Sequence, residues 1–152
     1  TRSEMTEVLL NNVKTKHFLA IITDQQGNII WKGASSPASS LYKAYYGGGL
    51  NLRHLSIYAN QAGMAIAVIA DRIGIENCYA VEMSQCGLEI FRKKGIYVEY
   101  QEIIPLVRSS KNPARVCPIE KFLSEHADDE KAQWDFLDEH FNNNEQVPSC
   151  SI

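Results

Sequence analysis

The sequence predicts one α/β domain whose mixed sheet combines an antiparallel hairpin with a parallel half. The chain has 152 residues, of which 45% are hydrophobic, so it can bury a sizeable core without disulfides or metals. Two apolar segments near the start, separated by a short polar turn, are typical of a hairpin. Further along, short apolar segments alternate with helical ones, which implies right-handed crossovers and parallel strands.

The N-terminal part is expected to contain a helix and the hairpin. Ser3 can cap a helix that continues through residues 8–13, and we expect this helix to be peripheral. Residues 18–23 are predicted to form a strand, residues 25–28 a turn and residues 29–32 the antiparallel partner strand.

A glycine triplet follows the next predicted helix. Residues 35–40 are expected to form a loop and residues 41–46 a short helix, which ends at Gly47, Gly48 and Gly49. The triplet could cradle a phosphate, but no strand precedes it and no Gly-Lys-Ser/Thr follows. A flexible connector is the favoured interpretation.

The central part predicts two strand–helix units and a further strand. Residues 55–58 and 78–83 are the predicted strands, and residues 61–73 form a helix so rich in Ala, Ile and Val that it should be buried. Gly63 near its start permits close approach of a neighbouring backbone. Ser84 caps the second helix, which ends at Gly95, and residues 96–100 form the next strand.

The C-terminal part begins with a loop over residues 105–118 that is longer than a connection requires and is rich in Ser, Lys, Asn, Pro and Arg. Pro118 opens a helix that reaches residue 125, and a last helix spans about residues 129–141. We expect a single domain over 1–152, with a core at about 17–125, a helical extension at about 128–142 and a flexible tail at 143–152. The extension carries an apolar cluster, expected to pack in the core or, alternatively, to form a dimer contact: Trp134, Phe136, Leu137 and Phe141.

Charge and hydropathy exclude several classes of protein. The formal net charge is −3 and the basic residues are scattered, so no nucleic-acid partner is expected. No apolar run approaches the roughly 18 residues of a membrane span. The chain does not begin with a signal-peptide pattern, and whether a leader was removed before Thr1 is left open. We expect a cytoplasmic protein. Its cysteines lack close C-x-x-C spacing and are expected to be reduced thiols: Cys78, Cys86, Cys117 and Cys150.

The order of these elements resembles that of the cytidine-deaminase-like fold. Four stretches within about residues 18–123 carry a closer resemblance to a small uncharacterised prokaryotic family with that fold: 63–65, the strand and turn leading to Ser84, 95–100, and the Cys-Pro-Ile-Glu at 117–120. The resemblance implies a three-layer α-β-α sandwich with extra terminal helices.

The zinc motifs of active deaminases are absent from the corresponding positions. Active members need a His or Cys with a Glu two residues later at one helix start, and Pro-Cys-x-x-Cys at another. Residues 60–64 offer no ligand and no carboxylate before Asp71, and residues 84–86 offer one thiol at most. His54 is followed by Ser56 where a Glu would be needed. The resemblance therefore implies a domain without zinc, without a cofactor and without zinc-dependent deaminase activity.

The chain also departs from the uncharacterised family at charged positions. Met64 stands where we expect a Lys, and Ala59 where we expect an acidic residue. Ser109 and Ser110 replace an expected Asn-Arg pair, although Arg108 and Arg115 lie nearby in the sequence.

A ligand pocket is predicted where the two central helices begin, because the carboxyl ends of their parallel strands meet there. Backbone N–H groups at helix starts favour an anion. The alternative is that Ser84 only caps its helix while Met64 and Cys86 only pack. The predicted ligand-binding residues are Gly63, Met64, Ser84, Gln85 and Cys86.

A second hypothesis places a reactive thiol at Cys117, with Arg115 adding positive potential and Glu120 nearby. It requires Cys117 to be exposed in a cleft. Otherwise Cys117 packs, and Glu120 answers the dipole of its own helix. The favoured function is non-catalytic binding of a small anionic or nucleotide-like ligand, or of a protein partner. The chain could also form a homodimer. The alternative function is an enzyme of different chemistry at Cys117.

Overall fold

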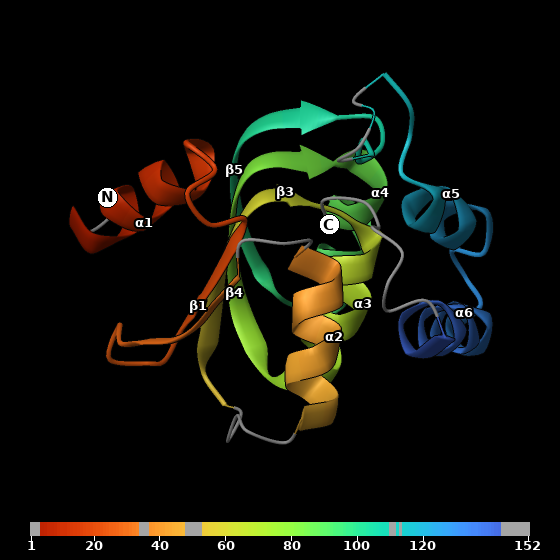
Figure 1. Cartoon of the computed structure of the whole chain (residues 1–152), viewed down its shortest axis with the longest axis horizontal. Helices are drawn as coiled ribbons and strands as arrows, with labels where there is room; N and C mark the ends of the chain where they lie inside the picture. Colours follow the sequence, from red (N-terminus) through yellow and green to blue (C-terminus); the bar gives the residue numbers. More distant parts are fainter. Residues whose placement is uncertain (1–3, 34–36, 48–52, 110–111, 113, 144–152) are drawn as a thin grey trace.

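The computed structural model describes residues 4–33, 37–47, 53–109, 112 and 114–143. In these ranges the chain forms helices on both faces of one five-stranded sheet (Figure 1). The helices are α1 (Glu4–Lys14), α2 (Pro37–Gly47), α3 (Met64–Ile73), α4 (Gln85–Lys93), α5 (Pro118–Glu125) and α6 (Glu130–Asn143). The strands are β1 (Ala20–Thr23), β2 (Ile29–Gly33), β3 (Leu55–Ala62), β4 (Ile75–Ser84) and β5 (Tyr97–Ile104).

The sheet is mixed, with the strand order β2-β1-β3-β4-β5. β1 pairs antiparallel with both β2 and β3, whereas β3, β4 and β5 pair parallel. The predicted α/β class, with its hairpin and its parallel half, is therefore confirmed. No helix in the described ranges is long and apolar enough to cross a membrane.

Contrary to the expectation of a peripheral element, α1 is one layer of the fold. It lies on the face of the sheet opposite α2, α3 and α4 (Figure 1). Leu9, Leu10 and Val13 pack there with Ile21 and Tyr58 in a second apolar cluster. α1 is therefore the only cover over that side of β1 and β3 among the described elements, which explains its amphipathic pattern.

The start of α3 differs from the prediction of a helix beginning at residue 61. β3 continues to Ala62, because Gln61 and Ala62 pair with β4. Gly63 is extended (φ −146°, ψ −155°) and acts as the N-cap, so the helix begins at Met64. As predicted, α3 is buried along most of its length and ends at Gly74, whose φ of 78° favours glycine.

Several other boundaries also shift. α2 begins at Pro37 rather than at residue 41, since proline suits the first turn of a helix. β4 and β5 are longer than predicted because each gains a partner along its whole length. Residues 34–36 and 48–52 lie outside the described ranges, and so does the hypothesis of a phosphate cradle at Gly48 and Gly49. The tail predicted at 143–152 also lies outside them, except for residue 143, which ends α6.

The C-terminal helices pack on the chain itself. Trp134, Leu137 and Phe141 are buried in the main core beside α2 and α3. Phe136 is half-buried and stacks on Phe122 of α5, with ring centroids 4.1 Å apart and planes 9° apart. The apolar cluster predicted on the last helix is thus part of the domain's own core.

Candidate functional site

The first place of interest is the junction where α3 and α4 begin, at the carboxyl ends of β3 and β4. Met64 and Ser84 are fully buried there. The start of α4 touches that of α3 so closely that a Cβ on Gly87 would lie 2.7 Å from the Gly63 backbone. Of the predicted ligand-binding residues, the structure thus brings Gly63, Met64 and Ser84 together. Gln85 faces solvent, and Cys86 is half-buried.

The junction is filled by the carboxylate of Glu120, which is fully buried although it comes from α5. It accepts hydrogen bonds from the Met64 N–H at 2.7 Å and from the Val107 N–H at 2.9 Å. The Ser84 hydroxyl is a third partner. Glu120 lies in the first turn of its own helix, as expected from the sequence, and its carboxylate also answers the N-terminal dipole of α3.

Gly63 makes room for this carboxylate. A Cβ on Gly63 would lie 2.7 and 2.8 Å from the Glu120 oxygens and 2.5 Å from Cγ2 of Val107. The sequence did predict that Gly63 permits a close approach, but it did not indicate that a side chain from α5 makes that approach.

The electrostatics of the junction are dominated by burial. Burial raises the pKa of Glu120, while the hydrogen bonds from Ser84, Met64 and Val107 oppose that shift. Burial also raises the pKa of the Cys86 thiol, and the negative charges of Glu120 and Glu89 add to that effect. Cys86 is therefore a poor thiolate nucleophile and a poor metal ligand.

The residues at this junction do not fit a zinc ion. Asn60 uses its amide to donate to the Val13 carbonyl at 2.9 Å, and Met64, Ser84 and Gln85 are not zinc ligands of the deaminase kind. Cys86 would be a single thiol with a raised pKa. In the described ranges no three His, Cys, Asp or Glu side chains gather in a way that could hold a metal ion.

Cys117, the centre of the thiol hypothesis, precedes α5 as its N-cap residue. Its side chain is fully buried, and its N–H donates to the Val107 carbonyl at 2.8 Å. The residue is disulfide-bonded, so the expectation of a reduced thiol is wrong for Cys117, whereas Cys78 and Cys86 are free. A buried, oxidised sulfur does not have the cleft exposure that the thiol hypothesis requires.

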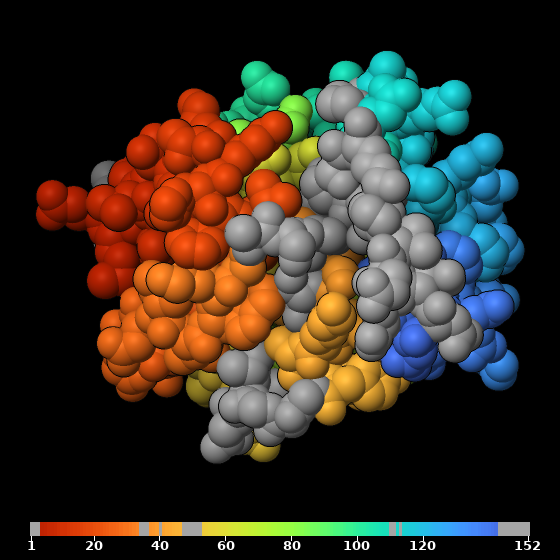
Figure 2. Space-filling view, in the orientation of Figure 1, coloured from red at the N-terminus to blue at the C-terminus, as the bar shows by residue number. Residues whose placement is uncertain are grey.

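Arg115 lies in a different place, on the loop between β5 and α5. This loop folds back on itself: Arg108 bridges Val116, and the Ser109 N–H donates to the Arg115 carbonyl at 2.9 Å. An open hollow of about 250 Å³ lies against this loop. It is lined by Pro105, Leu106, Arg108, Ala114, Arg115 and Val116. Figure 2 shows the cyan part of the chain around this loop at the outer surface of the molecule.

Arg108 and Arg115 are both exposed and line this hollow, so two positively charged residues contribute to its wall. The Arg108 N–H donates to Oε1 of Gln61 at 3.1 Å, which fixes the loop to the end of β3 beside the Glu120 junction. Sequence reasoning noted the long loop and both arginines, but it did not bring them together. The sequence signal for the pair is the presence of an Arg near each end of this loop.

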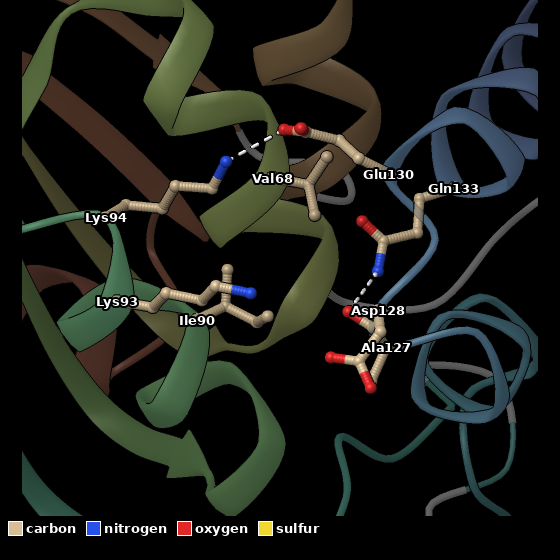
Figure 3. A pocket seen from close by; sticks show the side chains of 8 residues that line it. All are labelled: Val68, Ile90, Lys93, Lys94, Ala127, Asp128, Glu130 and Gln133. Carbon is tan, nitrogen blue, oxygen red and sulfur yellow. Dashed lines mark hydrogen bonds and ion pairs between the residues drawn. The ribbon is translucent and has the colours of Figure 1, made fainter.

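A second hollow, of about 120 Å³, lies between α4 and α6 (Figure 3). The Lys94 ammonium bonds Glu130 at 2.8 Å and lies 3.3 Å from Asp71, so it joins α4 to both α6 and α3. The Gln133 amide donates to the His126 carbonyl at 2.9 Å. These contacts hold the helices together, and we assign no ligand to this hollow.

Comparison with known proteins agrees with this fold. No curated protein matches the chain. A crystal structure of a DUF1893 family protein (TM1506) from Thermotoga maritima is similar, with a TM-score of 0.74 and 19% identity over 91% of this chain and 92% of the other. At that identity the likeness shows the fold alone. The sequence profile of TM1506, described as a domain of unknown function (DUF1893), matches residues 9–141, and the chain therefore belongs to the DUF1893 family.

Proposed function

We propose that this chain is a zinc-free, non-catalytic binding domain with a cytidine-deaminase-like arrangement. The observation that carries the proposal is the Glu120 carboxylate at the starts of α3 and α4. A deaminase of this kind would need an open position there for its zinc-bound water. In this chain the same place holds a side chain whose oxygens are already hydrogen-bonded, which leaves no room for a substrate.

The filled junction also argues against the ligand pocket predicted at Gly63 and Ser84. The hollow between Arg108 and Arg115 is the better candidate for an anion, because guanidinium groups bind phosphate and carboxylate in a fork geometry. Its volume of about 250 Å³ lies below the roughly 300–1,000 Å³ of ligand pockets for drug-sized molecules. It therefore suits a single phosphate or carboxylate group better than a whole nucleotide.

The ligand class we propose is thus a small anion, or the phosphate end of a nucleotide-like molecule. A cytoplasmic location without a nucleic-acid partner is part of the same proposal, and the net charge of −3 supports it.

A binding titration with three probes tests the proposal. Inorganic phosphate and AMP are expected to shift the NMR signals of residues 105–116, while adenosine, which lacks the phosphate, is not. Arg115→Ala is expected to weaken phosphate binding by roughly 10- to 150-fold, the range for a hydrogen bond to a charged group. Arg92→Ala, which removes an exposed arginine from the last turn of α4, is the matched control and should bind phosphate as the wild type does.

Two outcomes would contradict the anion site. One is adenosine binding as tightly as AMP, which would assign recognition to the base. The other is an Arg115→Ala protein that binds phosphate as well as Arg92→Ala does.

A further inference from the structure

The two outer strands of the sheet, β2 and β5, differ in how well they are protected against pairing with another chain. β2 has five residues, carries Lys32, and pairs with β1 through a register shift. β5 has eight residues, contains no Lys and no Pro, and pairs with β4 without a register shift from Tyr97 to Ile104. Natural proteins protect their edge strands with shortness, bulges and charged side chains, lysine above all. β2 has all three devices, whereas β5 is long and regular and has only Glu99 and Glu102 as charged residues.

Exposed apolar side chains mark both ends of β5. Tyr97 is 56% exposed and Ile103 is 44% exposed, although both belong to a regular strand. Between them lie Glu99, Gln101 and Glu102, with no basic residue. A partner strand on this edge would have to cover its exposed apolar ends and keep carboxylates apart.

We propose that β5 pairs antiparallel with β5 of a second copy of this chain, with the two-fold axis at Tyr100. This register places Tyr97 opposite Ile103 of the second copy, so the exposed apolar residues cover each other. Glu99 then faces Gln101, Glu102 faces Val98, and no carboxylate faces another. The two sheets join into one continuous sheet, and the net charge of −3 per chain adds little repulsion.

Other registers fit less well. In an antiparallel ladder the outward backbone groups alternate, so a two-fold axis must pass through a residue and not between two residues. An axis at Glu99 or Glu102 would set like charges face to face. An axis at Gln101 would place Tyr97 opposite Pro105, which has no N–H to donate. Axes nearer the ends of β5 would pair fewer residues.

Sedimentation of charge variants at Gln101 tests both the dimer and its register. Gln101 is exposed, so neither substitution should disturb the fold. Gln101→Lys sets a cation opposite Glu99 twice per dimer and should lower the dimer dissociation constant by roughly 2- to 30-fold. Gln101→Glu sets carboxylates opposite each other and should raise the constant by a similar factor. The same changes at Gln25, exposed in the hairpin turn, are matched controls and should leave it unchanged.

A wild type that sediments as a monomer at every concentration overturns the proposal. So does a dimer whose dissociation constant is unchanged or raised by Gln101→Lys. A constant lowered by Gln101→Lys and raised by Gln101→Glu, with both Gln25 controls unchanged, supports it. The test does not depend on the anion site, since no residue of that hollow lies in the proposed contact.

Discussion

At the scale of single residues, the contacts of Glu120 explain what the Cys-Pro-Ile-Glu stretch at residues 117–120 does in the fold. Pro118 begins α5, and Glu120 in the first turn of that helix reaches the start of α3. The carboxylate exchanges water for two backbone N–H groups and a hydroxyl. Burial disfavours its charged form, while the three donors favour that form, and burial dominates because the pKa is raised.

The raised pKa makes a prediction about pH. Below the ordinary value of 4.5, Glu120 is protonated in both folded and unfolded chains; above it the unfolded chain loses the proton first, so stability falls as the pH rises through the folded pKa. The stability of the wild type relative to Glu120→Gln should therefore be larger at about pH 4.5 than at neutral pH. Urea unfolding of both proteins across this range measures the difference. A difference that grows with pH would mean that the donors outweigh burial.

The sequence identified this stretch but could not indicate its role. Pro118 predicts the start of α5 locally, and the structure confirms it. The bond from Met64 to Glu120, in contrast, joins residues 56 positions apart, and no periodicity or spacing encodes such a contact. The same separation along the sequence explains why the residues around Gly63 and Ser84 did not indicate the Glu120 carboxylate between them: it comes from another part of the chain.

At the scale of elements, the interior of each helix and strand was more predictable than its ends. The buried helix α3, the cap at Ser84 and the hairpin follow from composition and turn chemistry. The wrong start of α3 arises because residues 60–62 carry both helix-compatible and strand-compatible side chains. Pairing of Gln61 and Ala62 with β4 decides between them, and that pairing is a tertiary interaction.

Lys94 provides a prediction about how helices are tied together. Its ammonium contacts Glu130 of α6 and Asp71 of α3, and the hydrogen bond to Glu130 is the main cause of its raised pKa. Since these carboxylates are partly exposed, Lys94→Met should lower the free energy of unfolding by no more than about 1 kcal/mol, and salt should reduce that loss.

The control is Lys131→Met, which removes an ion pair with Asp135 within α6 itself. Because this pair is exposed to solvent, its loss should lower the free energy of unfolding less than Lys94→Met does. Urea unfolding at low and high salt compares the two variants. A Lys94→Met loss that salt does not change would indicate that the side chain acts through packing.

At the scale of the whole molecule, the two apolar clusters lie on opposite faces of one sheet and share its strands. The main cluster takes Ile22 and Ile57 from β1 and β3, while the α1 cluster takes Ile21 and Tyr58 from the same strands. Neither cluster can lose its strands without exposing the other. The two layers should therefore unfold together, since α1 is joined to β3 both by its own small cluster and by the bond from Asn60 to the Val13 carbonyl.

This coupling can be tested with Leu10→Ala, which truncates a side chain of α1 that is 2% exposed. The variant should lose about 2–5 kcal/mol of stability, because a buried Leu leaves a cavity, and it should still unfold in one transition. Circular dichroism and fluorescence from Trp31 and Trp134, which lie in β2 and α6, should give coincident curves. The control is Val8→Ala, which truncates a side chain of the same helix that is 61% exposed. Its free energy of unfolding should stay within about 0.5 kcal/mol of the wild-type value. Two separate transitions for Leu10→Ala would show instead that α1 melts on its own and that the sheet keeps its other face folded without it.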